Sequence, residues 1–185
     1  MFSQKRLTGK LAMSALAATS ILSAAAYASD VTAPKLTLTA FVNGAGGESV
    51  MAGKYDEALS EIKYDRTSGA DAYTARVTNE CVAYAAKKQI TEALSACDKA
   101  VKAANYERMM AQRFSPGASF QTSYLAIAYT NRAIIHTLAK DLESAKSDMA
   151  HAQSLAPSAE IVTQNMLAMQ TSASKIAQLG VTPTR

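Results

Sequence analysis

Apolar residues recur at spacings of three and four through most of the chain from Glu48 onward. This spacing places side chains on one face of an α-helix, and the strongest break in it is Pro116-Gly117, which marks a loop. The pattern therefore predicts an all-α domain over residues 48–179. The positions that carry it are Val77, Cys81, Tyr84, Ala85, Ile90, Ala93, Leu94, Cys97, Val101, Ile127, Ile134, Ile135, Leu138, Leu142, Ala145, Met149 and Ala152.

The segment before this domain has a different pattern. Residues 35–42 read as a short extended run, and Asn43-Gly44-Ala45-Gly46-Gly47 follows as a flexible turn. Residues 29–47 are therefore expected to form an arm or linker. Two interpretations stay open, a loosely ordered leader and a β-strand that adds to the sheet edge of a partner.

Residues 1–28 have the layout of a secretory signal peptide. Three basic residues precede an acid-free apolar run over residues 11–26, and the pattern Ala26-Tyr27-Ala28 follows. We expect cleavage after Ala28 and a periplasmic or secreted protein, with an uncleaved anchor as the alternative. No other run approaches the roughly 20 apolar residues that span a bilayer.

Removing this leader changes the charge of the chain. It contains three of the 19 basic residues and none of the 15 acidic ones, so the formal charge of +4 becomes +1. The remaining charges of both signs are dispersed along the expected helices. Nucleic-acid binding, which needs clustered Lys and Arg, is therefore not expected.

The stretch AYTNRAIIHTLAKDLESAKSDMAHAQSLAP, residues 128–157, is similar to a tetratricopeptide repeat (TPR). The positions that match the family pattern are Tyr129, Ala133, Ala145, Met149 and Pro157, whereas Arg132 and His136 depart from the usual Leu and Tyr. Residues 77–105 fit the same frame without the closing Pro, and residues 53–59 resemble half a repeat. The resemblance implies a short solenoid of helical hairpins, with an insertion at about 106–125, a closing helix over 158–179 and a tail at 180–185.

The resemblance also implies a concave groove that binds a peptide. In the TPR family an Asn of the first helix often contacts the backbone of a bound peptide, and here Asn79, Asn131 and Asn165 occupy that position. These residues either contact a ligand or make hydrogen bonds within the fold, and the sequence leaves both roles open. The neighbouring candidates for partner binding are Thr78, Val82, Thr130 and Ile134.

Apolar and small residues replace the Lys and Arg that clamp a terminal carboxylate in some TPR proteins. A mildly apolar extended or helical segment is the expected ligand. The 106–125 insertion either joins such an interface or extends a helix on its own repeat. Arg132 has two candidate partners, Glu80 across the repeat interface and Asp148 within its own hairpin.

In the repeat frame the two cysteines occupy matched positions. The turn between their helices falls near Lys88 and Gln89, and Cys81 and Cys97 lie eight residues before and after it. Equal offsets place them at equal height on antiparallel helices, where neighbours such as Ala93 allow close approach. With an even cysteine count and an exported chain, the interpretation is a disulfide within one hairpin.

The sequence contains no G-x-S-x-G, H-E-x-x-H, C-x-x-C or phosphate-binding glycine loop. The two histidines, His136 and His151, fit a packing or groove role better than a metal site. We therefore expect no enzyme, no cofactor and no metal. The favoured hypothesis is an exported scaffold that binds a protein or peptide, the alternative is a self-assembling envelope protein, and an enzyme with an unrecognised site ranks third.

Overall fold

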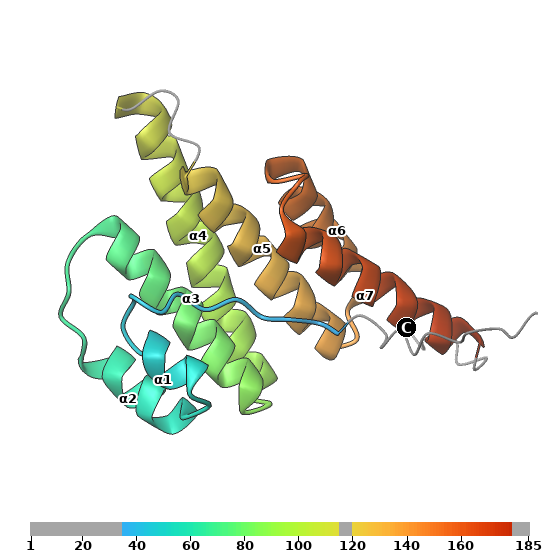
Figure 1. Ribbon diagram of the computed structural model, residues 1–185, viewed down its shortest axis with the longest axis horizontal. Helices are drawn as coiled ribbons and strands as arrows, with labels where there is room; N and C mark the ends of the chain where they lie inside the picture. The colour runs from blue at the N-terminus through green and yellow to red at the C-terminus, as the bar shows by residue number, and fades with distance from the viewer. Residues whose placement is uncertain (1–34, 115–119, 179–185) are drawn as a thin grey trace, which may run out of the picture. The chain divides into compact units, whose positions relative to one another are not determined.

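In the computed structural model, residues 35–114 and 120–178 are described, and they contain seven α-helices and no strand. The helices are α1 (Gly47–Met51), α2 (Tyr55–Tyr64), α3 (Ala70–Ala86), α4 (Ile90–Phe114), α5 (Phe120–Leu138), α6 (Leu142–Leu155) and α7 (Glu160–Gln178) (Figure 1). The predicted all-α class is confirmed for this part of the chain. The expected leader 1–28 with its cut after Ala28, arm residues 29–34, the Pro116-Gly117 loop and the tail 180–185 lie outside the described residues.

One backbone turn joins the helices of three successive hairpins. Gly53, Lys88 and Lys140 lie between α1 and α2, α3 and α4, and α5 and α6, and each has a positive φ of 61–74°. In every case the amide of this residue bonds a carbonyl three residues earlier, and the next amide bonds a carbonyl five residues earlier. Such left-handed turns satisfy the last carbonyls of a helix. The hairpins therefore share one local structure as well as one apolar pattern.

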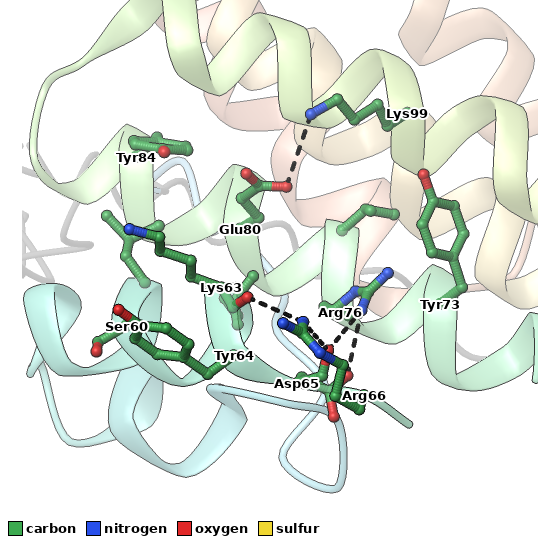
Figure 2. Close-up of a pocket in the computed structure, with 13 residues that line it drawn as sticks. Ser60, Lys63, Tyr64, Asp65, Arg66, Tyr73, Arg76, Glu80, Tyr84 and Lys99 are labelled. Carbon is green, nitrogen blue, oxygen red and sulfur yellow. Dashed lines mark hydrogen bonds and ion pairs between the residues drawn. The ribbon is translucent and has the colours of Figure 1, made fainter. Parts of the chain in front are cut away.

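The first hairpin is much shorter than the next one. Helix α1 has 5 residues and α2 has 10, whereas α3 has 17 and α4 has 25. Beside α2, a cleft of about 670 Å³ lies between α2, α3 and α4 (Figure 2). The cleft faces away from the asparagine positions of α3, because Tyr73, Val77 and Glu80 line it whereas Asn79 does not.

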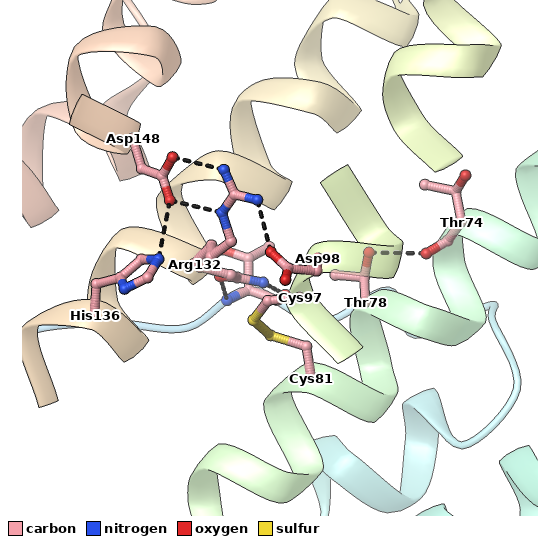
Figure 3. The surroundings of a disulfide bond; sticks show 10 residues. Thr74, Thr78, Cys81, Cys97, Asp98, Arg132, His136 and Asp148 are labelled. Carbon is pink, nitrogen blue, oxygen red and sulfur yellow. Dashed lines mark hydrogen bonds and ion pairs between the residues drawn. A yellow bond between two sulfur atoms is a disulfide. The ribbon is translucent and has the colours of Figure 1, made fainter. Parts of the chain in front are cut away.

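Small residues let α3 and α4 pack closely. The inward face of α4 consists of side chains that are at most 1% exposed, namely Ala93, Ala96, Cys97, Ala100 and Ala104. Cys81 on α3 faces Cys97 with a Cα–Cα distance of 5.0 Å, and the two sulfur atoms form a disulfide within the hairpin (Figure 3). Ile135 of α5 packs in the same cluster, so the disulfide lies in the core.

Helix α7 extends the core beyond the last hairpin. Val162 and Ala168 are each 1% exposed, and Val162 packs against Ala133, Met149 and Ala152 of α5 and α6. A helix was expected over 158–179, and its role as the closing helix of a solenoid stays a prediction. None of the helices in the described ranges is long and apolar enough to cross a membrane.

The region expected as an insertion at about 106–125 is mostly helical. Helix α4 continues to Phe114 and α5 begins at Phe120, so the described part extends both helices. Tyr106, Met109 and Phe114 are 57–67% exposed along this extension of α4. The described residues thus show helix extensions, and a role of this region in an interface stays a prediction.

The described part of the arm contains no strand, but residues 35–41 are extended and lie across the helices (Figure 1). The glycines after it make a compact turn where the sequence indicated only flexibility. Gly46 has a φ of 73°, which favours glycine, and a Cβ on Gly47 would lie 2.1 Å from the carbonyl oxygen of Phe41. These glycines allow the arm to fold back onto the domain.

The disulfide should contribute most of its effect through the unfolded chain. It joins residues 16 apart, and closing a loop of that size stabilises a protein by about 3 kcal/mol on the chain-entropy model. We expect the double variant Cys81→Ala with Cys97→Ala to lose about that much free energy of unfolding. Urea denaturation measures the loss, and the wild-type protein under reducing conditions is the matched control. Two titratable thiols in the unreduced protein would contradict the prediction.

Candidate functional site

Three buried asparagines from three helices form a ladder. Asn79 lies on α3, Asn131 on α5 and Asn165 on α7, and each is at most 1% exposed. A primary amide carries one acceptor oxygen and two donor hydrogens, and leaving these groups unpaired in the interior is unfavourable. These residues therefore require polar partners close by.

The partners are backbone groups of the arm. The amide of Thr37 donates to Oδ1 of Asn165 at 2.7 Å, and Nδ2 of Asn165 donates back to the carbonyl of Thr37 at 2.9 Å. Asn131 makes the same pair with Thr39 at 2.9 and 2.8 Å. The third pair joins Asn79 and Phe41 at 2.7 and 2.9 Å.

The regularity of the ladder follows from strand geometry. In an extended chain the N–H and C=O of one residue point to the same edge, and the next residue points to the opposite edge. Thr37, Thr39 and Phe41 therefore present their polar groups to one side at a step of two residues. Each asparagine pairs with one backbone N–H and one backbone C=O, so these hydrogen bonds do not depend on which side chain the arm residue carries.

Side chains of the arm add apolar contacts to these hydrogen bonds. Leu38 packs against two core clusters, one containing the Cys81–Cys97 disulfide and the other containing Val82. The ring of Phe41 lies edge-on to that of Tyr124 on α5, with 4.6 Å between centroids. The arm is therefore part of the packed structure.

The outer asparagines make one further hydrogen bond each. Nδ2 of Asn79 also donates to the carbonyl of Ala45 in the glycine turn at 3.1 Å, and Nδ2 of Asn165 donates to Ile161 of its own helix at 2.9 Å. With these bonds both donor hydrogens of the two amides are satisfied. Of the two roles that the sequence left open, hydrogen bonding within the fold is the one observed, and contact of these asparagines with a ligand stays a prediction.

The four neighbouring residues predicted for partner binding are buried beneath or beside the ladder. Thr78 and Thr130 are each 1% exposed, and their hydroxyls donate to carbonyls four residues earlier in their own helices. Val82 and Ile134 are 6% and 2% exposed. All four side chains are therefore part of the packed interior, and their contact with a partner stays a prediction.

An ion-pair network connects three helices beside the disulfide (Figure 3). Arg132 on α5 binds Asp148 on α6 through two hydrogen bonds of 2.7 and 2.8 Å, and it reaches Asp98 on α4 at 2.8 Å. Hydrogen bonding to Asp148 raises the pKa of Arg132 above its usual value, so the guanidinium stays charged. Of the two pairings expected from sequence, the one with Asp148 is observed, while Glu80 lies 4.0 Å from Lys99.

A buried carboxyl lies near the arm's aromatic contact. Glu107 on α4 is 7% exposed and accepts a hydrogen bond from the hydroxyl of Thr74 on α3. Burial raises the pKa of Glu107 above its ordinary value, and the nearby Asp71 acts in the same direction. Burial also raises the pKa of Tyr124, and Glu107 adds to this shift, which places the carboxyl close to the ring that contacts Phe41.

The arrangement suits hydrogen bonding to an extended chain. Among the described residues, no group of three or more His, Cys, Asp or Glu side chains is placed to hold a metal ion. His136 instead lies 3.3 Å from Asp141 and 3.8 Å from Asp148.

No protein-family model matches this chain, and comparisons with curated proteins and with solved structures found no significant match.

The contact between the arm and the three asparagines is the feature that sequence reasoning missed. The repeat frame located the three asparagines, and the extended pattern of residues 35–42 was recognised separately. No motif linked the two, because the three contacts span 38, 92 and 128 residues of sequence. The sequence did contain one signal. Alternate residues of an extended arm present their backbone groups to one edge, and three equivalently placed asparagines could pair with them.

Removing the central asparagine should release the middle of the arm. Asn131→Ala leaves the N–H and C=O of Thr39 without partners, which costs about 1–3 kcal/mol. We expect the amide of Thr39 to lose protection in native-state hydrogen exchange, while the core amides of α4 keep theirs. Asn105→Ala is the control, because its side chain forms hydrogen bonds with Arg108 and Met109 of its own helix and none with the described part of the arm. Unchanged exchange at Thr39 would contradict the ladder.

The buried carboxyl should make stability depend on pH. Because the pKa of Glu107 is raised in the folded state, its favourable contribution is full below about 4.5 and is lost as pH rises through the folded value. Glu107→Gln keeps the acceptor for Thr74 and removes the charge. The stability gain of this variant over wild type should therefore grow from pH 4 to pH 8 in thermal unfolding. Glu143→Gln, an exposed change on α6, controls for the lost charge; an equal gain from both variants would refute the prediction.

Proposed function

We propose that this chain is a non-enzymatic scaffold that binds an extended protein segment in the groove formed by α3, α5 and α7. The observation that carries the proposal is the asparagine ladder, in which three buried amides each bind the N–H and C=O of every second residue of an extended chain. The arm is the resident occupant, and it defines what the groove recognises. The proposal assigns no catalytic role and no cofactor.

The repeat architecture that we propose is TPR-like. It is supported by the shared turn at Gly53, Lys88 and Lys140. It is also supported by the pairs Thr78-Asn79 and Thr130-Asn131, in which the threonine bonds its own helix and the asparagine bonds the arm. Helix α7 repeats the asparagine alone and closes the array, as the end of a solenoid requires.

The ligand chemistry follows from the occupant. Because the ladder binds backbone, it tolerates many side chains, but it excludes proline at each laddered position since proline has no N–H. An apolar side chain at the position of Leu38 gains burial against the disulfide cluster. An aromatic side chain at the position of Phe41 gains contact with Tyr124. The preferred partner segment is therefore extended and alternates apolar with small polar residues.

A second candidate function is self-assembly through exchange of arms between copies. It is favoured by one observation, that the groove accepts a segment of this same chain. The arm is joined to α1 by the glycine turn at residues 42–46, so opening that turn is sufficient to place the arm in the groove of another copy. Both candidates use the same groove, and they differ in the source of the strand.

We place the protein outside the cytoplasm, in the periplasm or secreted. The proposal rests on the signal-peptide pattern of residues 1–28 and on the disulfide between Cys81 and Cys97, which persists in oxidising compartments. The disulfide lies beneath Leu38 of the arm. An oxidising location would therefore preserve the disulfide against which Leu38 packs.

Opening the groove should reveal its binding activity. We expect the double variant Thr37→Pro with Thr39→Pro to release the arm, because proline removes the amides that Asn165 and Asn131 accept. A labelled peptide KLTLTAFV, residues 35–42, should then bind this variant and bind wild type weakly, as measured by fluorescence anisotropy. The same peptide with proline at the two threonines should not bind.

Adding Asn131→Ala to the opened variant should weaken binding by about tenfold or more, since two hydrogen bonds are lost. Equal binding with and without Asn131 would contradict the groove assignment. Sedimentation across a range of concentrations separates the two candidates. A dimer that disappears in the proline variant favours arm exchange, whereas a monomer throughout favours a separate partner.

A further inference from the structure

The cleft between α2, α3 and α4 has the composition of a second binding site. It encloses about 670 Å³ and lies beside the short first hairpin (Figure 2). Its apolar floor includes Leu59, Ile62 and Val77. The asparagine groove is formed by other residues of α3, so the two sites share a helix without sharing side chains.

The cleft has an excess of positive charge. Four cationic side chains line it, against two carboxylates. Both carboxylates lie near a cation, Asp65 at 3.5 Å from Arg76 and Glu80 at 4.0 Å from Lys99. Within the described residues, neither Lys63 nor Arg66 forms an ion pair with a carboxylate. Arg66 donates only to the main-chain carbonyls of Lys63 and Asp65, at 3.5 and 3.3 Å.

Tyrosines accompany these cations at the rim. Tyr64 is 66% exposed and Tyr73 is 40% exposed, although both are large rings. The ammonium of Lys63 lies 5.5 Å from the Tyr64 ring, and the guanidinium of Arg76 lies 5.1 Å from the Tyr73 ring. Tyrosine and arginine are enriched among the residues that contribute most to protein interfaces, since they offer rigid area with a polar end.

We propose that this cleft binds an acidic segment of a partner protein. Carboxylates of the segment pair with Lys63 and Arg66, and an apolar side chain packs over Ile62 between the rings of Tyr64 and Tyr73. The cations come from α2, from the connection after it, from α3 and from α4, and Figure 2 shows them spread around the cleft. A ligand with several charges along its length fits this spread better than a single small anion does.

The site does not depend on the proposed function of the groove. Tyr73, Arg76, Val77, Glu80 and Tyr84 recur at helical spacing on the face of α3 that lines the cleft. Asn79 lies outside this stripe and binds the arm. A scaffold with both sites holds two segments on two different faces of one helix.

The test uses the mature chain and a labelled eight-residue peptide that alternates Glu with Leu or Phe. We expect binding that weakens with salt, and at least a tenfold weaker affinity for the same peptide with Gln in place of Glu. Lys63→Ala with Arg66→Ala should lower the affinity about tenfold, and Tyr64→Ala severalfold. Lys102→Ala with Lys146→Ala removes the same charge at exposed sites outside the cleft and should leave binding unchanged.

Circular dichroism melting of each variant checks that the fold is retained. An equal loss of affinity in the two double variants would reduce the effect to overall charge and overturn the proposal, as would equal binding of the Gln peptide. Loss of binding in Asn131→Ala would place the peptide in the groove instead. Phosphatidylglycerol vesicles are tested in parallel, and cleft-dependent binding to them without binding to the peptide would also overturn it.

Discussion

An extended backbone presents the N–H and C=O of one residue together on one edge, and this constraint organises the described domain. A buried asparagine amide is the side-chain match for such an edge, and the domain supplies one from each of α3, α5 and α7. The three amides bind every second residue of the arm, so α3, α5 and α7 present them at matching intervals. The same turn at Gly53, Lys88 and Lys140 joins the helices of each hairpin. The small residues of α4 allow it to pack closely against its neighbours.

Much of this arrangement could be predicted from local patterns. Apolar spacing predicted the helices because each helix buries one face. Equal offsets about one turn predicted the pairing of Cys81 and Cys97 because antiparallel helices convert sequence offset into height. The partner of Arg132 stayed open between Glu80 and Asp148, since helical spacing alone does not say how far a long side chain reaches.

The parts that could not be predicted depend on contacts between distant segments. The alternating pattern of residues 35–42 is compatible with any extended chain. Its contact with the three asparagines becomes visible only in the folded structure. The cleft is formed by residues of α2, α3 and α4, and the sequence pattern of each helix did not indicate how the three pack together. In both cases the feature depends on how separate elements pack in three dimensions, and periodicity along the chain does not describe that packing.

The order of the ladder has a consequence for how the molecule assembles. Moving along the arm from Thr37 to Phe41, the partners run backward through the chain, from α7 through α5 to α3. The contact of Thr37 therefore requires α7, whereas the contact of Phe41 requires only α3. A chain without α7 would keep the contacts of Thr39 and Phe41 and would lose both hydrogen bonds of Thr37.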